Sequence, residues 1–144
     1  MVKITVSEAF GFVPPRRPAV LCVRRSDGGT DLISTQWFTW LNFTRQPMIS
    51  YSMERSSKMG LNVSSGDEIF LAFPPEKEAA LYSSGVSKSI AETAASEFSV
   101  ALPVNCEVVF HCRISHAYNY PFKKVRIFNC DLDESYASDF LFMK

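Results

Sequence analysis

The chain has 144 residues, 47% of them hydrophobic, and its 15 basic residues balance 15 acidic ones. This length predicts one domain, residues 1–144, with a substantial core, and the balanced charge excludes attraction to nucleic acid or an anionic membrane by bulk charge. No apolar run approaches the length of a membrane span, and residues 1–6 alternate like a strand instead of forming the apolar core of a signal peptide. We therefore expect a soluble, cytoplasmic protein.

The cysteine pattern predicts no metal site. The four cysteines are scattered, with no Cys-x-x-Cys pair, at Cys22, Cys106, Cys112 and Cys130. Zinc sites usually contain close ligand pairs, and scattered thiols fit a reducing compartment. Within residues 107–114, Cys112 shares the apolar face of an alternating strand, and His111 points to the other face. We expect Cys112 to be a core residue.

Most of the predicted elements are strands. An apolar run over residues 19–23 predicts the first, and Ser26-Asp27-Gly28-Gly29 predicts a tight hairpin turn. The return strand is expected from about Thr30 to Trp37. Pro47 precedes an alternating strand over residues 48–53. After a turn at Gly66-Asp67, the next strand covers residues 68–73 and ends at Pro74-Pro75.

Three short helices are predicted between these strands. One opens at Ser56 and Ser57 and continues through residues 59–63, and a second covers residues 76–81. Ser89-Ile90-Ala91-Glu92 matches a capping box, which predicts a third helix ending before Phe98.

Two further strands are expected around residues 108–114 and 124–132, followed by a solvated acidic loop at residues 131–134. The whole pattern predicts a mainly β protein of six or seven strands, a small barrel or sandwich. Propensity alone does not distinguish a closed barrel from an open sheet.

The segment Arg55-Ser56-Ser57-Lys58 is built like an anion site. A helix start has unpaired N–H groups and partial positive charge, and serine is a preferred N-cap residue. Arg55 and Lys58 add full charges, and the serine hydroxyls can donate to phosphate oxygens. Just upstream, Thr35-Gln36-Trp37-Phe38-Thr39-Trp40 forms a dense aromatic patch with polar groups between the rings. Together they suit a phosphorylated planar cofactor; the alternative is a capped surface helix beside core aromatics.

The order of these segments resembles the flavin reductase-like domain family. It runs strand, Asp-Gly turn, Thr-x-Trp-Phe-Thr, proline-led strand, serine-rich helix start and a strand ending in proline. Residues 18–23, 32–42, 47–62 and 67–74 carry the resemblance, with a weaker match through 83–98 and 107–113, about two-thirds of the chain. The resemblance implies an FMN-binding split β-barrel.

The resemblance also implies where a flavin binds. The phosphate of FMN, or the inner phosphate of FAD, is expected at Arg55, Ser56, Ser57 and Lys58. The isoalloxazine ring is expected against Thr35, Gln36, Trp37, Phe38 and Thr39, whose backbone N–H groups would stabilise reduced flavin. Ser50 and Ser52 share one strand face, so their hydroxyls are expected to serve the ribityl chain. Trp37 as a core residue and Lys58 as a solvated one remain the alternatives.

The function that the resemblance implies has three versions. The first is an NAD(P)H-dependent flavin reductase that passes hydride to flavin N5 with no assigned catalytic side chain. The second is an FMN-holding electron carrier that exchanges electrons with a redox protein partner. The third is a flavin-free split-barrel binding module. Members of the family are usually homodimers that complete the flavin site at the subunit interface.

One departure from the family pattern bears on this choice. The family's Gly-Asp-His is absent, residues 117–122 stand in its place, and nearby His116 is not assigned the role of the missing histidine. The flavin half of the resemblance is therefore better supported than the NAD(P)H half.

Overall fold

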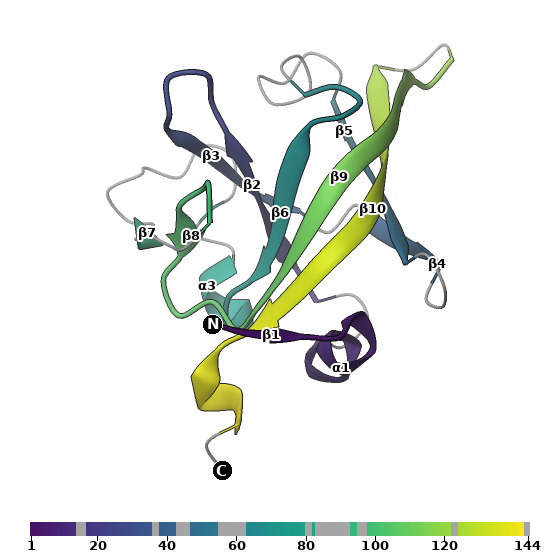
Figure 1. Ribbon diagram of the computed structural model, residues 1–144. Helices are drawn as coiled ribbons and strands as arrows, with labels where there is room; N and C mark the ends of the chain where they lie inside the picture. The colour runs from purple at the N-terminus through teal and green to yellow at the C-terminus, as the bar shows by residue number, and fades with distance from the viewer. Residues whose placement is uncertain are drawn as a thin grey trace.

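The computed structural model describes residues 1–13, 17–35, 38–42, 47–54, 63–79, 82, 93–94, 98–121 and 124–142. Its elements, in chain order, are β1 (Val2–Ile4), α1 (Val6–Phe12), β2 (Ala19–Arg24), β3 (Thr30–Thr35), β4 (Phe38–Asn42), β5 (Met48–Glu54), β6 (Glu68–Phe73), α3 (Glu76–Ala79), β7 (Thr93–Ala94), β8 (Leu102–Pro103), β9 (Val108–Asn119), β10 (Val125–Ala137) and a 3-10 helix (Asp139–Phe142). Figure 1 shows β6, β9 and β10 next to one another at the centre, with β2 and β3 on one side and β4 and β5 on the other.

One antiparallel sheet forms the body of the protein. Its strands follow the order β3-β2-β6-β9-β10-β5-β4, and β1 pairs with β10. The end strands β3 and β4 are joined through residues 36–37, so three Cα steps place Thr35 and Phe38 within about 11 Å of each other. Because the two ends of the strand order are tied this closely, the sheet must curl into a barrel.

The barrel encloses the larger of two hydrophobic clusters. Inward-facing side chains of β2, β5, β6, β9 and β10 build it, together with Ala9 of α1. The smaller cluster lies on the outer face of β2, β6 and β9, and α3, Tyr82 and residues 98–106 contribute to it. Strand β2 is therefore buried on both faces, which explains its continuous apolar run.

Several predicted elements are confirmed. Strands β2, β5 and β6 cover the predicted runs, and α3 lies inside the predicted second helix. The β2–β3 turn is closed by two hydrogen bonds, from the Arg25 amide to the Gly29 carbonyl (2.7 Å) and from the Gly28 amide to the Arg25 carbonyl (3.0 Å). Gly28 takes φ of 89°, which glycine adopts without strain. The predicted turn at Gly66-Asp67 is present as well.

Other predictions are wrong. The strand predicted at residues 1–6 is present as β1 (Val2–Ile4), but the helix α1 that follows it was not predicted, although Thr5 and Glu8 make its capping box. The return strand expected from about Thr30 to Trp37 is present as β3 over Thr30–Thr35, but the strand β4 over residues 38–42 was not predicted. The acidic run at residues 131–134 belongs to β10 instead of a loop, because β10 pairs with β9 on both sides of a bulge at Asp133.

The third predicted helix is wrong at Thr93–Ala94, which pair with Leu102–Pro103 as β7 and β8. The remaining residues of that helix, 89–92 and 95–97, lie outside the described residues, as does the helix start at residues 55–62.

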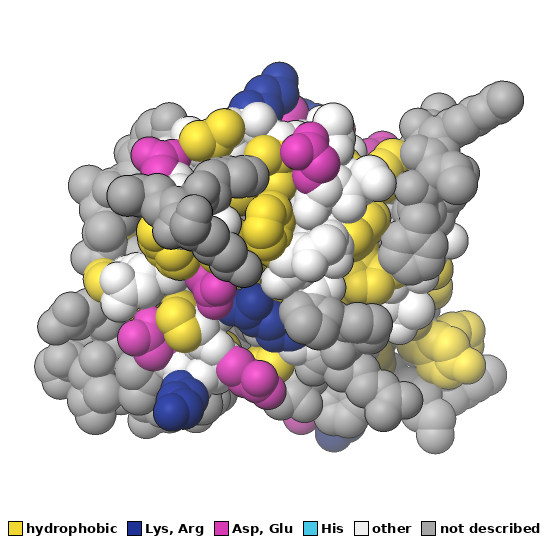
Figure 2. Space-filling view, turned by 90° about the horizontal axis from the view of Figure 1, so that it is seen from below, with side chains coloured by type: hydrophobic (Ala, Val, Ile, Leu, Met, Phe, Trp, Pro, Cys, Tyr) yellow, Lys and Arg dark blue, Asp and Glu magenta, His cyan; other side chains and the backbone are white. Residues whose placement is uncertain are grey.

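Charge is mixed on the surface, in line with the balanced composition. Seen from below, Lys and Arg side chains lie beside Asp and Glu side chains (Figure 2). Across the described ranges, no helix is both long enough and apolar enough to span a membrane.

Candidate functional site

A row of polar side chains crosses the outer face of the sheet from β4 to β9. Thr39 is the Cα partner of Ser50, Ser50 of Asn129, and Asn129 of His116. Directly opposite residues in a sheet point to the same face, so these four side chains lie side by side. We call this set, together with Ser52 on the same face of β5, the outer polar face.

A β-bulge sets which β9 residues reach this face. The β9–β10 register shifts between Asn129 and Cys130, leaving Ser115 as the extra residue. The Ser115 hydroxyl donates to the Asn129 carbonyl at 2.9 Å, which stabilises the bulge. Ile114 before the bulge is buried, whereas His116 after it is exposed. The bulge therefore moves His116 and Tyr118 from the inner face to the outer one.

Three of the predicted cofactor residues lie on the outer polar face. Thr39 is exposed, and Ser50 and Ser52 are half-buried and point the same way, as the alternation of β5 predicted. Of the remaining candidates, six lie outside the described residues: Gln36, Trp37, Arg55, Ser56, Ser57 and Lys58.

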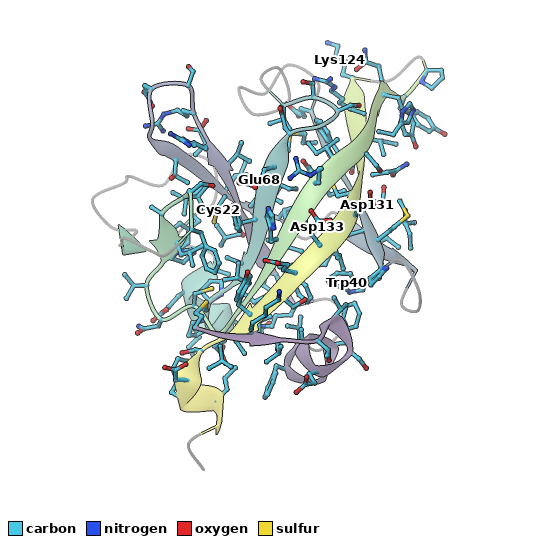
Figure 3. All side chains as sticks on the ribbon, viewed as in Figure 1. Cys22, Trp40, Glu68, Lys124, Asp131 and Asp133 are labelled. Atoms are coloured by element: carbon cyan, nitrogen blue, oxygen red, sulfur yellow. The ribbon has the colours of Figure 1, made fainter. Side chains whose placement is uncertain are left out.

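The described aromatic residues of the predicted patch face the barrel interior. Phe38 packs edge-to-face against Trp40 (ring centroids 5.6 Å apart) and Phe73 (6.2 Å). Figure 3 shows Trp40 beside α1, where its ring lies 4.8 Å from that of Phe10. Thr35 is buried at the end of β3. Because the Phe38 side chain faces the interior, only the backbone groups of this residue can contact a ligand on the outer face.

Strand β4 offers such backbone groups. It ends the strand order and pairs only with β5 among the described residues. The free edge of a terminal strand exposes N–H and C=O groups that can hydrogen-bond a ligand. The N–H groups of residues 38–39 thus belong to an edge strand next to Ser50.

A second polar cluster, missed by the sequence analysis, lies on the outer face of β6 and β9. His111 Nε2 is 2.7 Å from Glu68 Oε2, and the Ser99 hydroxyl donates to Glu68 Oε1 at 2.9 Å. The His111 ring stacks on Phe70, with centroids 4.9 Å apart. Alternation correctly placed His111 opposite the core face, but its hydrogen-bond partner Glu68 lies 43 positions away in sequence, on another strand. Figure 3 shows Glu68 on β6, in the middle of the sheet.

The hydrogen bonds of this cluster set the charge state of Glu68. Burial acts to raise the pKa of Glu68, but the hydrogen bonds from Ser99 and His111 outweigh it and lower that pKa below its ordinary value. Glu68 is therefore a carboxylate at neutral pH. Among the described residues, no group of three or more His, Cys, Asp or Glu side chains could hold a metal ion.

Comparison with solved structures identifies the fold class. The flavin reductase of the styrene monooxygenase from Pseudomonas putida S12 is similar over 85% of this chain and 80% of its own, with a TM-score of 0.68 and 14% identity. The FMN-binding protein from Thermus thermophilus is similar over 91% and 77%, with a TM-score of 0.68 and 15% identity. The NADH:FAD oxidoreductase SgcE6 from Streptomyces globisporus C-1027 is similar over 87% and 77%, with a TM-score of 0.65 and 15% identity.

No family and no curated protein matches this chain by sequence. The structural similarity shows that the chain has the split β-barrel fold of flavin reductase-like proteins, which confirms the predicted fold.

Proposed function

We propose that this protein is an oxidoreductase that binds FMN, or the larger FAD, at the outer polar face and uses NAD(P)H to reduce the flavin. One observation carries the proposal. In a fold shared with an FMN-binding protein and two flavin-reducing enzymes, Thr39 of β4 and Ser50 of β5 lie side by side on one outer face. When bound, FMN supplies the chemistry of accepting a hydride and passing electrons on.

The residues of this face suit the parts of a flavin nucleotide. The hydroxyls of Ser50 and Ser52 are neutral groups that can both donate to and accept from the ribityl hydroxyls. The neighbouring Asn129 amide adds a further donor and acceptor. Backbone N–H groups at the β4 edge would hydrogen-bond the polar rim of the ring.

The phosphate needs positive charge, which the outer polar face itself lacks. Arg55 and Lys58 follow β5 in the sequence and supply two full charges, and the hydroxyls of Ser56 and Ser57 can donate to phosphate oxygens. We propose that residues 55–58 hold the phosphate. We further propose a homodimer with the flavin near its subunit interface, as the resemblance implies, and either a small molecule or a redox protein as the electron acceptor.

A visible absorption spectrum tests the proposed function. The protein is mixed with FMN, desalted, and then treated with NADH or NADPH under anaerobic conditions. We expect a retained flavin band that bleaches with one of the nucleotides. A band that neither nucleotide bleaches would make the protein a flavin-holding electron carrier. A desalted protein without the band would contradict flavin binding and leave the binding-module alternative.

Substitutions test the position of the flavin. We expect Ser50→Ala combined with Ser52→Ala, and separately Ser56→Ala combined with Ser57→Ala, to weaken FMN binding about tenfold or more, because each pair removes hydrogen bonds to the ligand. The exposed Ser7→Ala on α1 is the matched control and should bind FMN like the wild type. Unchanged FMN affinity in both double variants would show that the site lies elsewhere.

A further inference from the structure

We propose that Phe10 of α1 is a positioning residue for the flavin: its ring holds Trp40 in place, and through Trp40 it fixes the position of the β4 backbone. The inference rests on the proposed function and deepens it, because it makes a helix at the lower end of the sheet (Figure 1) control the balance between oxidised and reduced flavin. Phe10 packs against the larger hydrophobic cluster and not on the outer polar face, so it acts through β4.

The first argument is the set of rings around Trp40. Its ring centroid lies 4.8 Å from that of Phe10, 5.4 Å from that of Phe110 on β9 and 5.6 Å from that of Phe38 on β4. The closest of these contacts therefore comes from α1, an element outside the sheet (Figure 3). The planes of the Phe10 and Trp40 rings meet at 81°, an edge-to-face arrangement that aromatic pairs favour.

The second argument is that β4 depends on its inward rings for its position. Among the described residues, β4 pairs with β5 alone, and its register shifts directly after Trp40. Regular pairing therefore covers Phe38, Thr39 and Trp40, on one edge of the strand. Because no described strand holds the other edge, the packing of the Phe38 and Trp40 rings decides where the β4 backbone lies.

The third argument is that α1 is anchored at both ends. Before the helix, β1 pairs with the end of β10, and a capping box starts the helix itself. After the helix, the Arg17 guanidinium donates to the Phe12 carbonyl at 3.4 Å and forms an ion pair with Glu107 at the start of β9. The Phe10 ring is thus fixed relative to the barrel, which allows it to hold Trp40.

The fourth argument is the alternation of β4, which connects the inner rings to the outer face. Phe38 and Trp40 point into the barrel, so Thr39 between them points outward, next to Ser50. A displacement of Trp40 must therefore move the backbone beside Thr39, where we propose that N–H groups hydrogen-bond the flavin ring. Binding sites need their groups held within about 0.5 Å of the productive geometry.

The charge of reduced flavin makes such a displacement selective. Negative charge grows on the polar edge of the ring when flavin is reduced, and hydrogen bonds to a charged acceptor are stronger than those to a neutral one. Displaced N–H groups therefore weaken the binding of reduced flavin more than that of oxidised flavin. A general loss of stability would weaken both forms alike, so the ratio of the two Kd values distinguishes a positioning role from a merely structural one.

The test measures this ratio in the wild type, Phe10→Leu, Phe10→Met and the control Phe98→Leu. Phe98 is a matched control because it is also partly buried and packs against two rings, Phe70 at 5.3 Å and Tyr136 at 4.8 Å, but in the smaller cluster. Titration gives the Kd of oxidised FMN. Reductive titration with dithionite and a reference dye gives the midpoint potential of bound FMN, from which the Kd of reduced FMN follows. Urea unfolding of the flavin-free protein gives the stability of each variant.

We expect Phe10→Leu to raise the Kd of reduced FMN about tenfold more than that of oxidised FMN, which lowers the midpoint potential by about 30 mV for a two-electron couple. Phe10→Met keeps more of the side-chain length and should shift the potential in the same direction by less. Phe98→Leu should keep the wild-type potential, although its free energy of unfolding should fall as that of Phe10→Leu does.

The inference is overturned if the midpoint potential of both position-10 variants equals or exceeds that of the wild type, or if Phe98→Leu lowers it equally. Loss of the fold in both position-10 variants also overturns it, because Phe10 would then support the whole core and not β4 in particular. A wild type that retains no FMN contradicts the proposed function, and the inference with it.

Discussion

The hydroxyl of Tyr51 is a buried polar group with no hydrogen-bond partner among the described residues. The side chain is 2% exposed and its ring stacks on Phe128, with centroids 4.9 Å apart. Burial raises the pKa of this phenol far above its ordinary value, so the neutral form persists at any physiological pH. The ring contributes to the core, whereas the hydroxyl has lost its hydration without compensation.

We therefore expect Tyr51→Phe to leave the free energy of unfolding unchanged or to raise it by up to about 1 kcal/mol. The matched control is Tyr82→Phe, because Tyr82 is also a buried tyrosine and its hydroxyl bonds to the backbone of Val104. The free energy of unfolding of Tyr82→Phe should be about 1 kcal/mol lower than that of the wild type. Urea unfolding at neutral pH measures both variants. A loss of more than about 1 kcal/mol in Tyr51→Phe would show that its hydroxyl has a partner.

At the scale of elements, Glu68 connects three parts of the fold. It lies at the start of β6, contacts His111 of β9, and accepts a hydrogen bond from Ser99 in the segment before β8. The same segment is held by the Phe98 ring against Phe70 (5.3 Å) and by the Ala101 amide, which donates to the Thr30 hydroxyl at 2.8 Å. The segment covers the smaller hydrophobic cluster, so its attachment depends partly on the charge state of one carboxylate.

The lowered pKa of Glu68 gives this attachment a pH dependence. A carboxylate whose folded-state pKa is below its unfolded value of about 4.3 stabilises the fold above that value, and the stabilisation is lost as pH falls through the folded pKa. We expect Glu68→Gln to be less stable than the wild type at pH 7, by less than about 1 kcal/mol because the side chain is partly exposed. The difference should shrink between pH 5 and pH 3, as measured by urea unfolding.

Exposed Glu76→Gln on α3 is the control for this comparison. Its free energy of unfolding should equal that of the wild type at every pH. If the difference between Glu68→Gln and the wild type stayed constant from pH 7 to pH 3, the carboxylate of Glu68 would not be the group that titrates.

The sequence predicted those elements in which a single local signal dominates. Strand β5 alternates and β6 is bounded by a turn and two prolines, so both were found. Helix α1 was missed although Thr5 and Glu8 carry its capping box, because the strand signal of residues 1–6, which is correct for β1 at Val2–Ile4, runs up to the start of the helix. The bulges in β9 and β10 were not predictable, since a register shift depends on the partner strand and not on local composition.

The candidate site was predicted only in part for the same reason. Ser50 and Ser52 were expected on one face because both belong to one alternating strand. Asn129 and His116 join them only through strand pairing across β10, which no local pattern encodes.

At the scale of the whole molecule, β2, β6 and β9 lie between the two hydrophobic clusters and contribute side chains to both. The four free cysteines are divided between these clusters. Cys112 and Cys130 belong to the larger cluster inside the barrel, and Cys22 and Cys106 to the smaller cluster outside. Burial raises the pKa of both Cys106 and Cys130 to about 12, and the pKa values of Cys22 and Cys112 are also well above the ordinary value.

We expect none of the four thiols to react with iodoacetamide in the native protein at pH 7.5, because each is buried and protonated. All four should react after unfolding. At intermediate denaturant, Cys22 and Cys106 should be modified before Cys112 and Cys130, because only short elements cover the outer cluster. Mass spectrometry of peptides identifies the modified sites, and a Ser7→Cys variant is the accessible-thiol control. Rapid native labelling of Cys112 would contradict the buried core.

Because of the bulge at Ser115, deleting one residue from this region would change the structure more than substituting one. A substitution at position 115 removes one hydrogen bond, whereas deletion of the residue would reverse the orientation of every side chain from His116 to Asn119. His116 and Tyr118 would then turn into the barrel and Ala117 would face solvent. In descendants of this gene, point changes at position 115 should therefore persist, while single-residue deletions between positions 114 and 119 should be eliminated by selection.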